Sequence, residues 1–494
     1  MLLEMAAEGF GDRVAIGSAD GGLTYRGLFN KAGAASERFR SGDNTHVAMA
    51  DLSSVALPIS LFGAAWAGLP FVPLNYRLTD EELLALTTRV SPAVVVVDPD
   101  DPDRLAGYAG IDVIERHRLL DLVCGVEPQD PDWTMTGEDT AIVLFTSGTT
   151  GQPKAAVLRH RHLVSYVLGS VEFMQASEDD AALVSVPPYH VAGIAAILSN
   201  VYAGRRVVQL PTFDAAAWVA LVRAESVTSA MVVPTMLTLI VGFLDAEGPD
   251  GPGLPTLRSL SYGGGRMPLP TIRRALELLP TTAFVNAYGL TETSPVTHIN
   301  PRTSALKVAS VGTPLPNTEH RIVDLATMKD APQGELGEVW IRGPQVMKGY
   351  LHNQEATREM IDEEGWLHSG DIGRTDDDGY LYVVDRVKEL IKYKGLQVAP
   401  AELEAVLQSH PAVADVAVIP SPDEEAGEVP KAFVVVKPET TLTADEVIAF
   451  VAERVSPQKK VRKVEFIDAI PKVPSGKILH RTLVERERAS VGSR

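Results

Sequence analysis

Short apolar or β-branched runs alternate with longer segments of helical spacing along most of the chain. Such runs are typical of buried strands, and they predict strands at Ala93–Val97, Ala141–Phe145, Ala182–Val186, Arg206–Leu210, Ala230–Val233 and Thr282–Val285. The segments between them have the spacing of helices, for example Ala215–Ala224 and Leu269–Leu279. This alternation predicts a layered α/β fold.

The pattern changes after residue 310, where short strands and turns replace the longer alternation. Strands are predicted at His320–Asp324, Gly337–Gly343 and Gly379–Asp385. A further α+β unit follows, with helices predicted over Pro400–Ser409 and Ala444–Val455 and strands over Val413–Ile419, Lys431–Val436 and Lys463–Phe466. No internal repeat is visible, and the change of pattern indicates a second kind of architecture near the C-terminus.

The length of 494 residues is enough for two or more domains. The segment Leu52–Leu74 is apolar enough to raise the question of a membrane span, but prolines and glycines interrupt it. We therefore expect a buried helix, a turn and a strand there. A single cysteine, Cys124, excludes an internal disulfide framework, and the acidic start has no basic n-region. These features favour the cytoplasm.

The net charge of −19 argues against nucleic acid as a partner. Residues 387–494 hold 16 basic and 16 acidic side chains, so residues 1–386 carry the whole negative charge. An anionic ligand would therefore depend on local basic groups and backbone dipoles. The general acidity itself is that of a well-solvated surface.

The segment Ala141–Arg159, AIVLFTSGTTGQPKAAVLR, suggests a phosphate-binding loop. Its glycines, Gly148 and Gly151, allow backbone N–H groups to approach an anion closely. Hydroxyl groups can donate to phosphate oxygens or bind Mg²⁺, and Lys154 adds a positive charge; the hydroxyl residues are Thr140, Thr146, Ser147, Thr149 and Thr150. The spacing does not fit the Walker type of loop, and a polar turn after a strand remains the alternative.

TSGTTGQPK resembles the signature of the adenylate-forming superfamily, which includes acyl- and aryl-CoA synthetases, peptide-synthetase adenylation domains and firefly luciferase. The family loop usually continues Lys-Gly, whereas this chain continues Lys154-Ala155. The resemblance implies a large N-terminal domain of layered α/β subdomains and a small mobile α+β C-terminal domain. It places the hinge at Asp385–Lys388, which gives domains of residues 1–385 and 386–494. The implied ligands are ATP, Mg²⁺ and coenzyme A.

A second motif, Asn286-Ala287-Tyr288-Gly289-Leu290-Thr291-Glu292, follows the strand that ends near Val285. Without the resemblance it could be a strand-to-helix turn with Thr291 as the N-cap. The family resemblance implies that Tyr288 stacks on adenine, Thr291 contacts phosphate, and Glu292 binds Mg²⁺ together with Thr149. Upstream, Gly263, Gly264 and Gly265 resemble the strand on the other face of the nucleobase. The family commonly has Gly-Gly-Ala-Pro there, and Arg266 departs from it with an open role.

Two further motifs precede and form the predicted hinge. The carboxylate of Asp371, in Trp366-Leu367-His368-Ser369-Gly370-Asp371, could accept hydrogen bonds from a ribose diol, although an Asp after Ser-Gly is more often a turn residue. By resemblance, Asp371 and Arg386 form the ribose clamp. RVKELIKYKGLQ closely matches 4-coumarate–CoA ligase-like enzymes, which implies Lys388 as the pivot. Lys392 and Gln397 would then reach the active site, and Gly395 would let the pantetheine arm pass.

The last motif, Val473-Pro474-Ser475-Gly476-Lys477, presents a lysine on a glycine loop. Lys477 could be one surface lysine among many. Its resemblance to the family motif implies that its ammonium group stabilises charge at the α-phosphorus during adenylation.

Two other patterns suggest metal ions, and both have simpler structural interpretations. The first, Thr375–Gly379, contains three aspartates but lies between two predicted strands, so a hairpin turn is expected. The second, Arg159-His160-Arg161-His162, resembles the start of a family helix and is interpreted as structural.

The acid-binding pocket is expected around residues 187–194, 233–237 and 263–265. His190 resembles the gating residue of the family. The alternative interpretation is that His190 is packed at the end of a strand. No acid stands near His190 to hold an ammonium group, which disfavours α-amino acids. Ala287 replaces the Arg that is typical of malonate-activating relatives. An apolar acid, fatty or aryl-propenoic, remains.

These features predict an ATP-dependent acyl-CoA synthetase in which a fatty acid is the favoured substrate. An acyl-AMP ligase that loads a carrier protein, an aryl-CoA ligase and a non-catalytic nucleotide-binding regulator stay as alternatives. A homodimer is possible.

Overall fold

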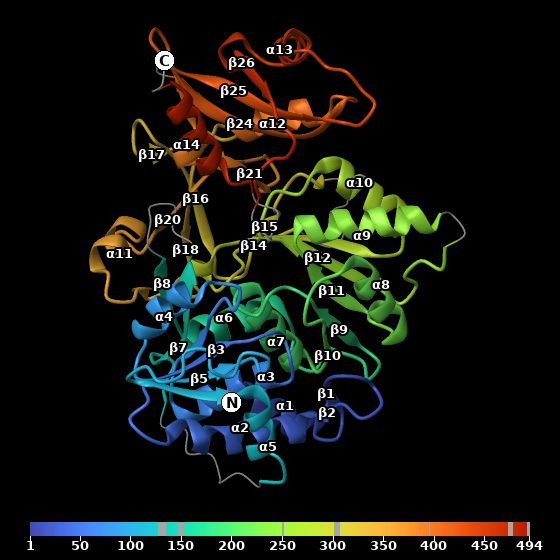
Figure 1. The fold of residues 1–494 in the computed structure, drawn as a ribbon, viewed down its shortest axis with the longest axis vertical. Helices are drawn as coiled ribbons and strands as arrows, with labels where there is room; N and C mark the ends of the chain where they lie inside the picture. The colour runs from blue at the N-terminus through green and yellow to red at the C-terminus, as the bar shows by residue number, and fades with distance from the viewer. Residues whose placement is uncertain are drawn as a thin grey trace.

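The computed structural model describes residues 1–126, 135–146, 153–248, 251–300, 307–394, 396–472 and 478–491. Figure 1 shows a large N-terminal body with a smaller C-terminal unit at one end, and the segments around β16, β18, β20 and β21 lie between them. The chain therefore has the predicted α/β architecture of a large and a small domain.

One N-terminal sheet has the strand order β19-β8-β7-β4-β3-β5-β6. Its central strands β7, β4, β3, β5 and β6 run parallel, whereas β8 returns antiparallel to β7. The strands are β3 (His46–Ala50), β4 (Phe71–Pro73), β5 (Ala93–Val97), β6 (Ile111–Glu115), β7 (Thr140–Thr146), β8 (Lys154–Arg159) and β19 (Gly349–Tyr350). The predicted strand Ala93–Val97 matches β5 at both ends, because its run of buried alanine and valine has no competing pattern.

A second sheet has the order β15-β14-β13-β12-β11-β9-β10-β1-β2. The strands from β13 to β1 are parallel. The strands are β1 (Val14–Ile16), β2 (Leu23–Thr24), β9 (Ala181–Val184), β10 (Arg206–Gln209), β11 (Ser229–Val232), β12 (Ser259–Gly263), β13 (Ala283–Tyr288), β14 (His298–Ile299) and β15 (Thr313–Pro314). The carboxyl ends of β12 and β13 carry the two predicted nucleotide motifs.

Helices cover these two sheets and pack with them in two apolar clusters, a large one that spans both sheets and a smaller one on one face of the first sheet. They are α1 (Leu2–Phe10), α2 (Tyr25–Arg40), α3 (Ala56–Ala67), α4 (Asp80–Thr88), α5 (Arg116–Leu122), α6 (His160–Ser170), α7 (Val191–Ala203), α8 (Ala215–Ala224), α9 (Pro234–Glu247) and α10 (Leu269–Leu278). The segment Leu52–Leu74 forms buried α3, a turn and β4, as predicted. No helix in the described part of the chain has the length and hydropathy of a membrane span.

A third, antiparallel sheet follows in the order β17-β16-β18-β20-β21. Its strands are β16 (Glu319–Asp324), β17 (Lys329–Asp330), β18 (Gly337–Arg342), β20 (Leu367–Thr375) and β21 (Leu381–Arg386), and α11 (Gln354–Met360) precedes β20. The aspartate-rich segment 375–379 is the turn between β20 and β21. Asp376 accepts the Tyr380 N–H and pairs with Lys307 at 2.7 Å, so the predicted hairpin turn is confirmed.

The C-terminal unit begins after the 3-10 helix η3 (Val387–Glu389) and has its own core. Its sheet contains β22 (Ile391–Tyr393), β23 (Leu396–Val398), β24 (Val413–Asp423), β25 (Gly427–Val436) and β26 (Lys463–Phe466). Its helices are α12 (Pro400–Gln408), α13 (Ala444–Ala452), η4 (Pro457–Lys459) and α14 (His480–Val491). The boundary at residues 385 and 386 stays a prediction.

Candidate nucleotide and acid-activation site

Asp371 is the centre of a polar cluster between the N-terminal body and the third sheet. Its carboxylate is buried and accepts a hydrogen bond from the Tyr288 hydroxyl at 2.7 Å. The Arg386 Nε lies 3.1 Å from the other carboxylate oxygen, because Asp371 and Arg386 are direct partners on β20 and β21. A carboxylate has about four acceptor positions, so Asp371 can also accept hydrogen bonds from a ribose diol. The structure thus brings three predicted site residues together.

Tyr288 ends β13 and is fixed by its hydroxyl group. Burial, together with the nearby Asp371 carboxylate, raises the pKa of Tyr288 well above its ordinary value, so the hydroxyl remains a hydrogen-bond donor. At the next residue, a Cβ added to Gly289 would lie 1.8 Å from the Pro295 backbone oxygen. Only glycine fits this close approach of two main chains. The turn after β13 is therefore shaped by backbone packing.

Glu292 belongs to a second polar cluster, which sequence reasoning did not find. It lies in the short helix η1 (Thr291–Thr293), is 8% exposed, and its Oε1 accepts the Tyr350 hydroxyl at 2.8 Å. The Lys154 ammonium group lies 5.0 Å from the centre of the Tyr350 ring, within the range of a cation–π contact. Tyr350 joins them because β19 pairs with β8. The only sign of Tyr350 in the sequence is the dipeptide Gly349-Tyr350, and the pairing of this short strand with β8 cannot be predicted from the sequence.

Mg²⁺ is typically held by one or two carboxylates together with phosphate oxygens. The described ranges contain no group of three or more His, Cys, Asp or Glu side chains suited to a metal ion. A single buried carboxylate, Glu292, near the cationic Lys154 fits a metal ion that arrives with a phosphate group. It does not fit a metal ion that the protein alone would hold.

The glycines after β12 and the residues before Tyr288 lie on adjacent strands. Gly263 pairs with Ala287, and a Cβ on Gly263 would lie 2.3 Å from the Ala287 backbone oxygen. Gly264 has a φ of +78°, and both Gly264 and Gly265 are exposed. The Asn286 amide donates to the Ser310 carbonyl at 2.9 Å. Close backbone packing therefore leaves no room for a side chain at Gly263.

His190 is the N-cap residue of α7 and is exposed on one side. Its ring lies 4.8 Å from the Tyr189 ring, which in turn contacts Tyr76. Desolvation by the surrounding protein lowers the pKa of His190, which favours a neutral imidazole. The other histidine pattern is structural, as predicted, because buried His162 accepts the Arg159 backbone N–H at 3.1 Å.

The two predicted CoA-facing residues are neighbours on one hairpin. Lys392 on β22 pairs with Gln397 on β23, and both are exposed. Lys472 and Ile478 form a β-bridge, and the Leu479 N–H donates to the Pro471 carbonyl oxygen. Seven predicted site residues lie outside the described residues: Ser147, Gly148, Thr149, Thr150, Gly151, Gly395 and Lys477.

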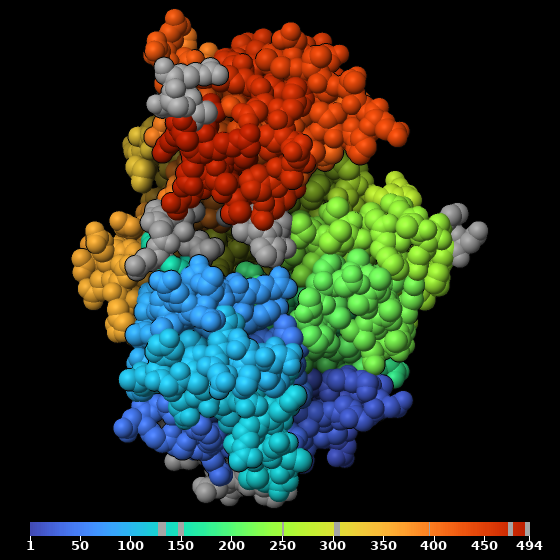
Figure 2. Space-filling model, in the orientation of Figure 1, coloured from blue at the N-terminus to red at the C-terminus, as the bar shows by residue number. Residues whose placement is uncertain are grey.

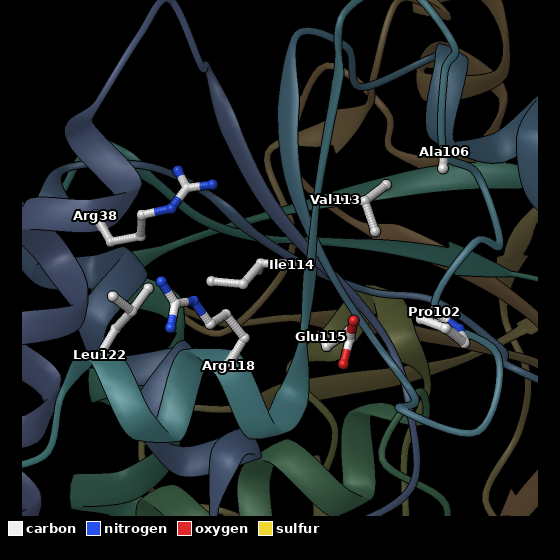
Figure 3. A pocket seen from close by; sticks show the side chains of 8 residues that line it. All are labelled: Arg38, Pro102, Ala106, Val113, Ile114, Glu115, Arg118 and Leu122. Atoms are coloured by element: carbon white, nitrogen blue, oxygen red, sulfur yellow. The ribbon is translucent and has the colours of Figure 1, made fainter.

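Two surface cavities are lined by other residues than the described members of the predicted site. One, of about 420 Å³, is lined by α2, α5 and the edge strand β6, and Figure 3 shows Arg38 and Arg118 extending from these two helices. The other, of about 490 Å³, lies along the third sheet beside His320 and Gln333. Within the described ranges, no predicted site residue lines either cavity, so neither is assigned to the chemistry of the site.

Residues 3–351 match the AMP-binding enzyme family, and residues 402–477 match the AMP-binding enzyme C-terminal domain. The chain belongs to the AMP-binding enzyme family. Its fold and its relatives are those of AMP-forming acid–CoA ligases, which use ATP, Mg²⁺ and CoA.

Three curated plant relatives are similar in sequence. The chain is 43% identical to 4-coumarate–CoA ligase-like 9 of Arabidopsis thaliana over 351 residues, which cover 70% of this chain and 62% of the relative. It is 37% identical to 4-coumarate–CoA ligase-like 6 of Oryza sativa subsp. japonica, covering 91% and 79%. It is 38% identical to peroxisomal OPC-8:0-CoA ligase 1 of A. thaliana, covering 70% and 64%. The matches thus span between three fifths and four fifths of these relatives.

Solved structures cover the whole architecture. ATP-bound MatB of Rhodopseudomonas palustris is 28% identical, with a TM-score of 0.89 over 98% of this chain and 99% of that chain. Apo MatB, with the same coverage, has a TM-score of 0.80. o-Succinylbenzoate-CoA synthetase (MenE) of Bacillus subtilis with ATP and magnesium is 27% identical, with a TM-score of 0.84 over 98% of this chain and 99% of that chain.

Proposed function

We propose that this protein is an ATP-dependent acyl-CoA synthetase for an apolar carboxylic acid, with a fatty acid as the first candidate. The observation that carries the proposal is the cluster around Asp371. A buried carboxylate there is held by Tyr288 and Arg386 and keeps acceptor positions for a ribose. The buried Glu292 and the cationic Lys154 add a place for a metal-bound phosphate group.

In the first step, a carboxylate oxygen of the acid attacks the α-phosphorus of ATP, a new P–O bond forms, and pyrophosphate leaves. Asp371 and Arg386 would hold the ribose, and Tyr288 would lie against adenine. Glu292 and Thr149 would bind Mg²⁺, which neutralises phosphate charge when bound. Thr291 and the loop residues 146–151 would contact phosphate. Lys477 would stabilise the charge that develops at the α-phosphorus.

In the second step, the CoA thiol attacks the acyl carbonyl, a C–S bond forms, and AMP leaves. The C-terminal domain, residues 386–494, would turn about Lys388 between the two steps. Lys392, Gly395 and Gln397 would then serve the CoA side of the site. This division follows the family resemblance, and the pairing of Lys392 with Gln397 on one exposed hairpin supports it.

The orientation of the two domains in this structure supports a role in the first step, adenylate formation. With equal coverage of this chain, the TM-score is 0.89 for ATP-bound MatB and 0.80 for apo MatB. The higher score supports a domain arrangement closer to that of the ATP-bound relative. This is the orientation in which adenylate formation would take place.

The substrate class rests on the pocket residues and on the relatives. The helix after His190 begins Val191-Ala192-Gly193 and offers no charge for an ammonium or a second carboxylate. Relatives named 4-coumarate–CoA ligases favour an aryl-propenoic acid, whereas the relative named OPC-8:0-CoA ligase favours an acyl chain. We keep the aryl acid as the second candidate. The cytoplasm and a possible homodimer also stay proposals.

The deciding experiment measures pyrophosphate release with MgATP across acetate, longer fatty acids, cinnamates and benzoates. Each acid is tested with and without CoA, and acyl-AMP and acyl-CoA are detected by mass. Acyl-CoA from fatty acids supports the first candidate, and acyl-CoA from cinnamates alone supports the second. Acyl-AMP that persists with CoA indicates a carrier-protein ligase. No adenylate from any acid refutes the proposal and favours a nucleotide-binding regulator.

A further inference from the structure

Arg266 reaches from the N-terminal body to the C-terminal domain. It lies between β12 and α10, and its Nη1 donates to the Ala401 carbonyl oxygen at 2.5 Å. Ala401 is in the first turn of α12. Figure 1 shows α10 directly beneath the C-terminal domain, and Figure 2 shows green N-terminal segments in contact with that domain. The side chain that departs from the family motif therefore makes an interdomain contact.

Asp385 binds the backbone N–H of Ala401, whose carbonyl oxygen is bound by Arg266. Its Oδ2 accepts the Ala401 N–H at 2.8 Å, and its Oδ1 accepts the Arg386 N–H at 2.7 Å. Asp385 is the penultimate residue of β21 and is 8% exposed. The first N–H groups of a helix lack partners within the helix and carry partial positive charge, so they stabilise the Asp385 anion, although burial raises the pKa of this carboxyl to about 6. Both peptide groups of Ala401 are thus bound by side chains, one from Arg266 in the N-terminal body and one from Asp385, the first residue of the predicted hinge.

The alanine side chain itself takes no part in these two hydrogen bonds. Arg266 and Asp385 bind main-chain atoms, so what they fix is the position and direction of the first turn of α12. A rotation of the C-terminal domain about Lys388 would carry this turn away from Arg266, which belongs to the N-terminal body. The contact therefore belongs to one orientation of the domains.

Helix α12 is in turn connected to the base of α14, three residues after Lys477. The Glu404 Oε1 lies 2.8 Å from the His480 Nε2 and also accepts the Val418 N–H at 2.9 Å. On its other side, the His480 Nδ1 lies 3.4 Å from Glu389. These contacts join the hinge, α12, β24 and α14 into one unit. The position of α12 is consequently linked to that of His480, the first residue of α14.

We propose that Arg266 is an interdomain positioning residue that, with Asp385, clamps the first turn of α12 and favours the orientation used for adenylate formation. The inference rests on the proposed two-step function, because only a reaction with two domain orientations requires the clamp to open. Arg266 then assists the first step and opposes the second. Since its side chain is exposed, its contribution is that of one charge-assisted hydrogen bond near solvent, about 3- to 10-fold in population.

The test measures the two half-reactions separately in the full-length protein. Pyrophosphate release without CoA reports adenylation, and thioester formation from supplied acyl-adenylate and CoA reports the second step. Arg266→Ala should slow adenylation about 3- to 10-fold and leave the second step equal or faster. Arg266→Lys should partly restore adenylation, because the ammonium group can still donate. The control is Arg273→Ala on α10, since exposed Arg273 shows no hydrogen bond or ion pair within the described ranges.

A distance measurement tests the clamp without relying on activity. With Cys124 replaced by Ser, spin labels at the exposed positions Leu239 on α9 and Lys437 after β25 report the interdomain distance without substrates. Arg266→Ala should broaden or shift the distance distribution, and Arg273→Ala should not. If the distribution changes but no acid is adenylated, the clamp stands and the proposed function fails. An unchanged distribution, or equal losses in both half-reactions, overturns the clamp.

Discussion

Replacing Asp371 with asparagine separates the charge of this side chain from its shape. The carboxylate is 5% exposed as a side chain and is held between Arg386 and Tyr288. A hydrogen bond to a charged group contributes about 1.5–3 kcal/mol, and a neutral acceptor about half of that. If two ribose hydroxyls bind Asp371, Asp371→Asn loses about 1 kcal/mol for each hydroxyl. The kcat/KM for ATP should fall about 30-fold.

A comparison of ATP with 2′-deoxy-ATP decides whether that loss comes from the ribose. The deoxy nucleotide lacks one of the two hydroxyls, so the preference for ATP should fall about fivefold in Asp371→Asn. Initial rates of pyrophosphate release at varied nucleotide concentration give both ratios. The control is Asp376→Asn at the turn of the same hairpin, where Asp376 pairs with Lys307. An ATP preference in Asp371→Asn equal to that of the unmodified protein would refute the ribose assignment.

Three further changes test the hinge, the metal side of the site and its backbone. Burial disfavours a charged imidazole at His480, but the carboxylates around it outweigh this effect and raise the pKa of His480 above its ordinary 6.5. The charged imidazole therefore stabilises the folded protein fully below pH 6.5, and this contribution is lost as pH rises through the raised pKa. Denaturation midpoints should show that loss in the unmodified protein and not in His480→Gln, and parallel pH profiles would contradict it. Tyr350→Phe removes the hydroxyl that donates to Glu292, a hydrogen bond that contributes about 1–2 kcal/mol. The Mg²⁺ concentration for half-maximal pyrophosphate release should then rise several-fold, and an unchanged concentration would count against a role of Tyr350 in holding Glu292. Gly289→Ala would force its Cβ against a backbone oxygen and lower the free energy of unfolding by at least about 2 kcal/mol, whereas Gly242→Ala in α9, with open space around it, should be neutral or stabilising in the same thermal melt.

Elements with a continuous local pattern were predictable from the sequence. The all-buried valine run of β5, the apolar spacing of α8 and the short β26 have the predicted residues at both ends. The strand at β25 is longer than predicted, because Gly427–Pro430 pairs with the end of β24 without an apolar pattern. Pairing of this kind depends on the partner strand and not on local propensity.

The residues of the candidate site show the same difference between local patterns and contacts of distant segments. Local motifs single out Tyr288, Glu292 and Asp371. The structure has Tyr288 at the end of β13 and Glu292 in the short helix η1, whereas Asp371 lies in the middle of β20 and not in a turn. Tyr350 and the interdomain contact of Arg266 depend on sheet pairing and on domain packing between residues far apart in sequence. A sequence motif identifies side chains that contact a ligand, because such side chains lie at a fixed spacing along the chain. A residue that binds only main-chain atoms of another domain, as Arg266 does, leaves no such spacing, and its departure from the family pattern was the one local sign of its position.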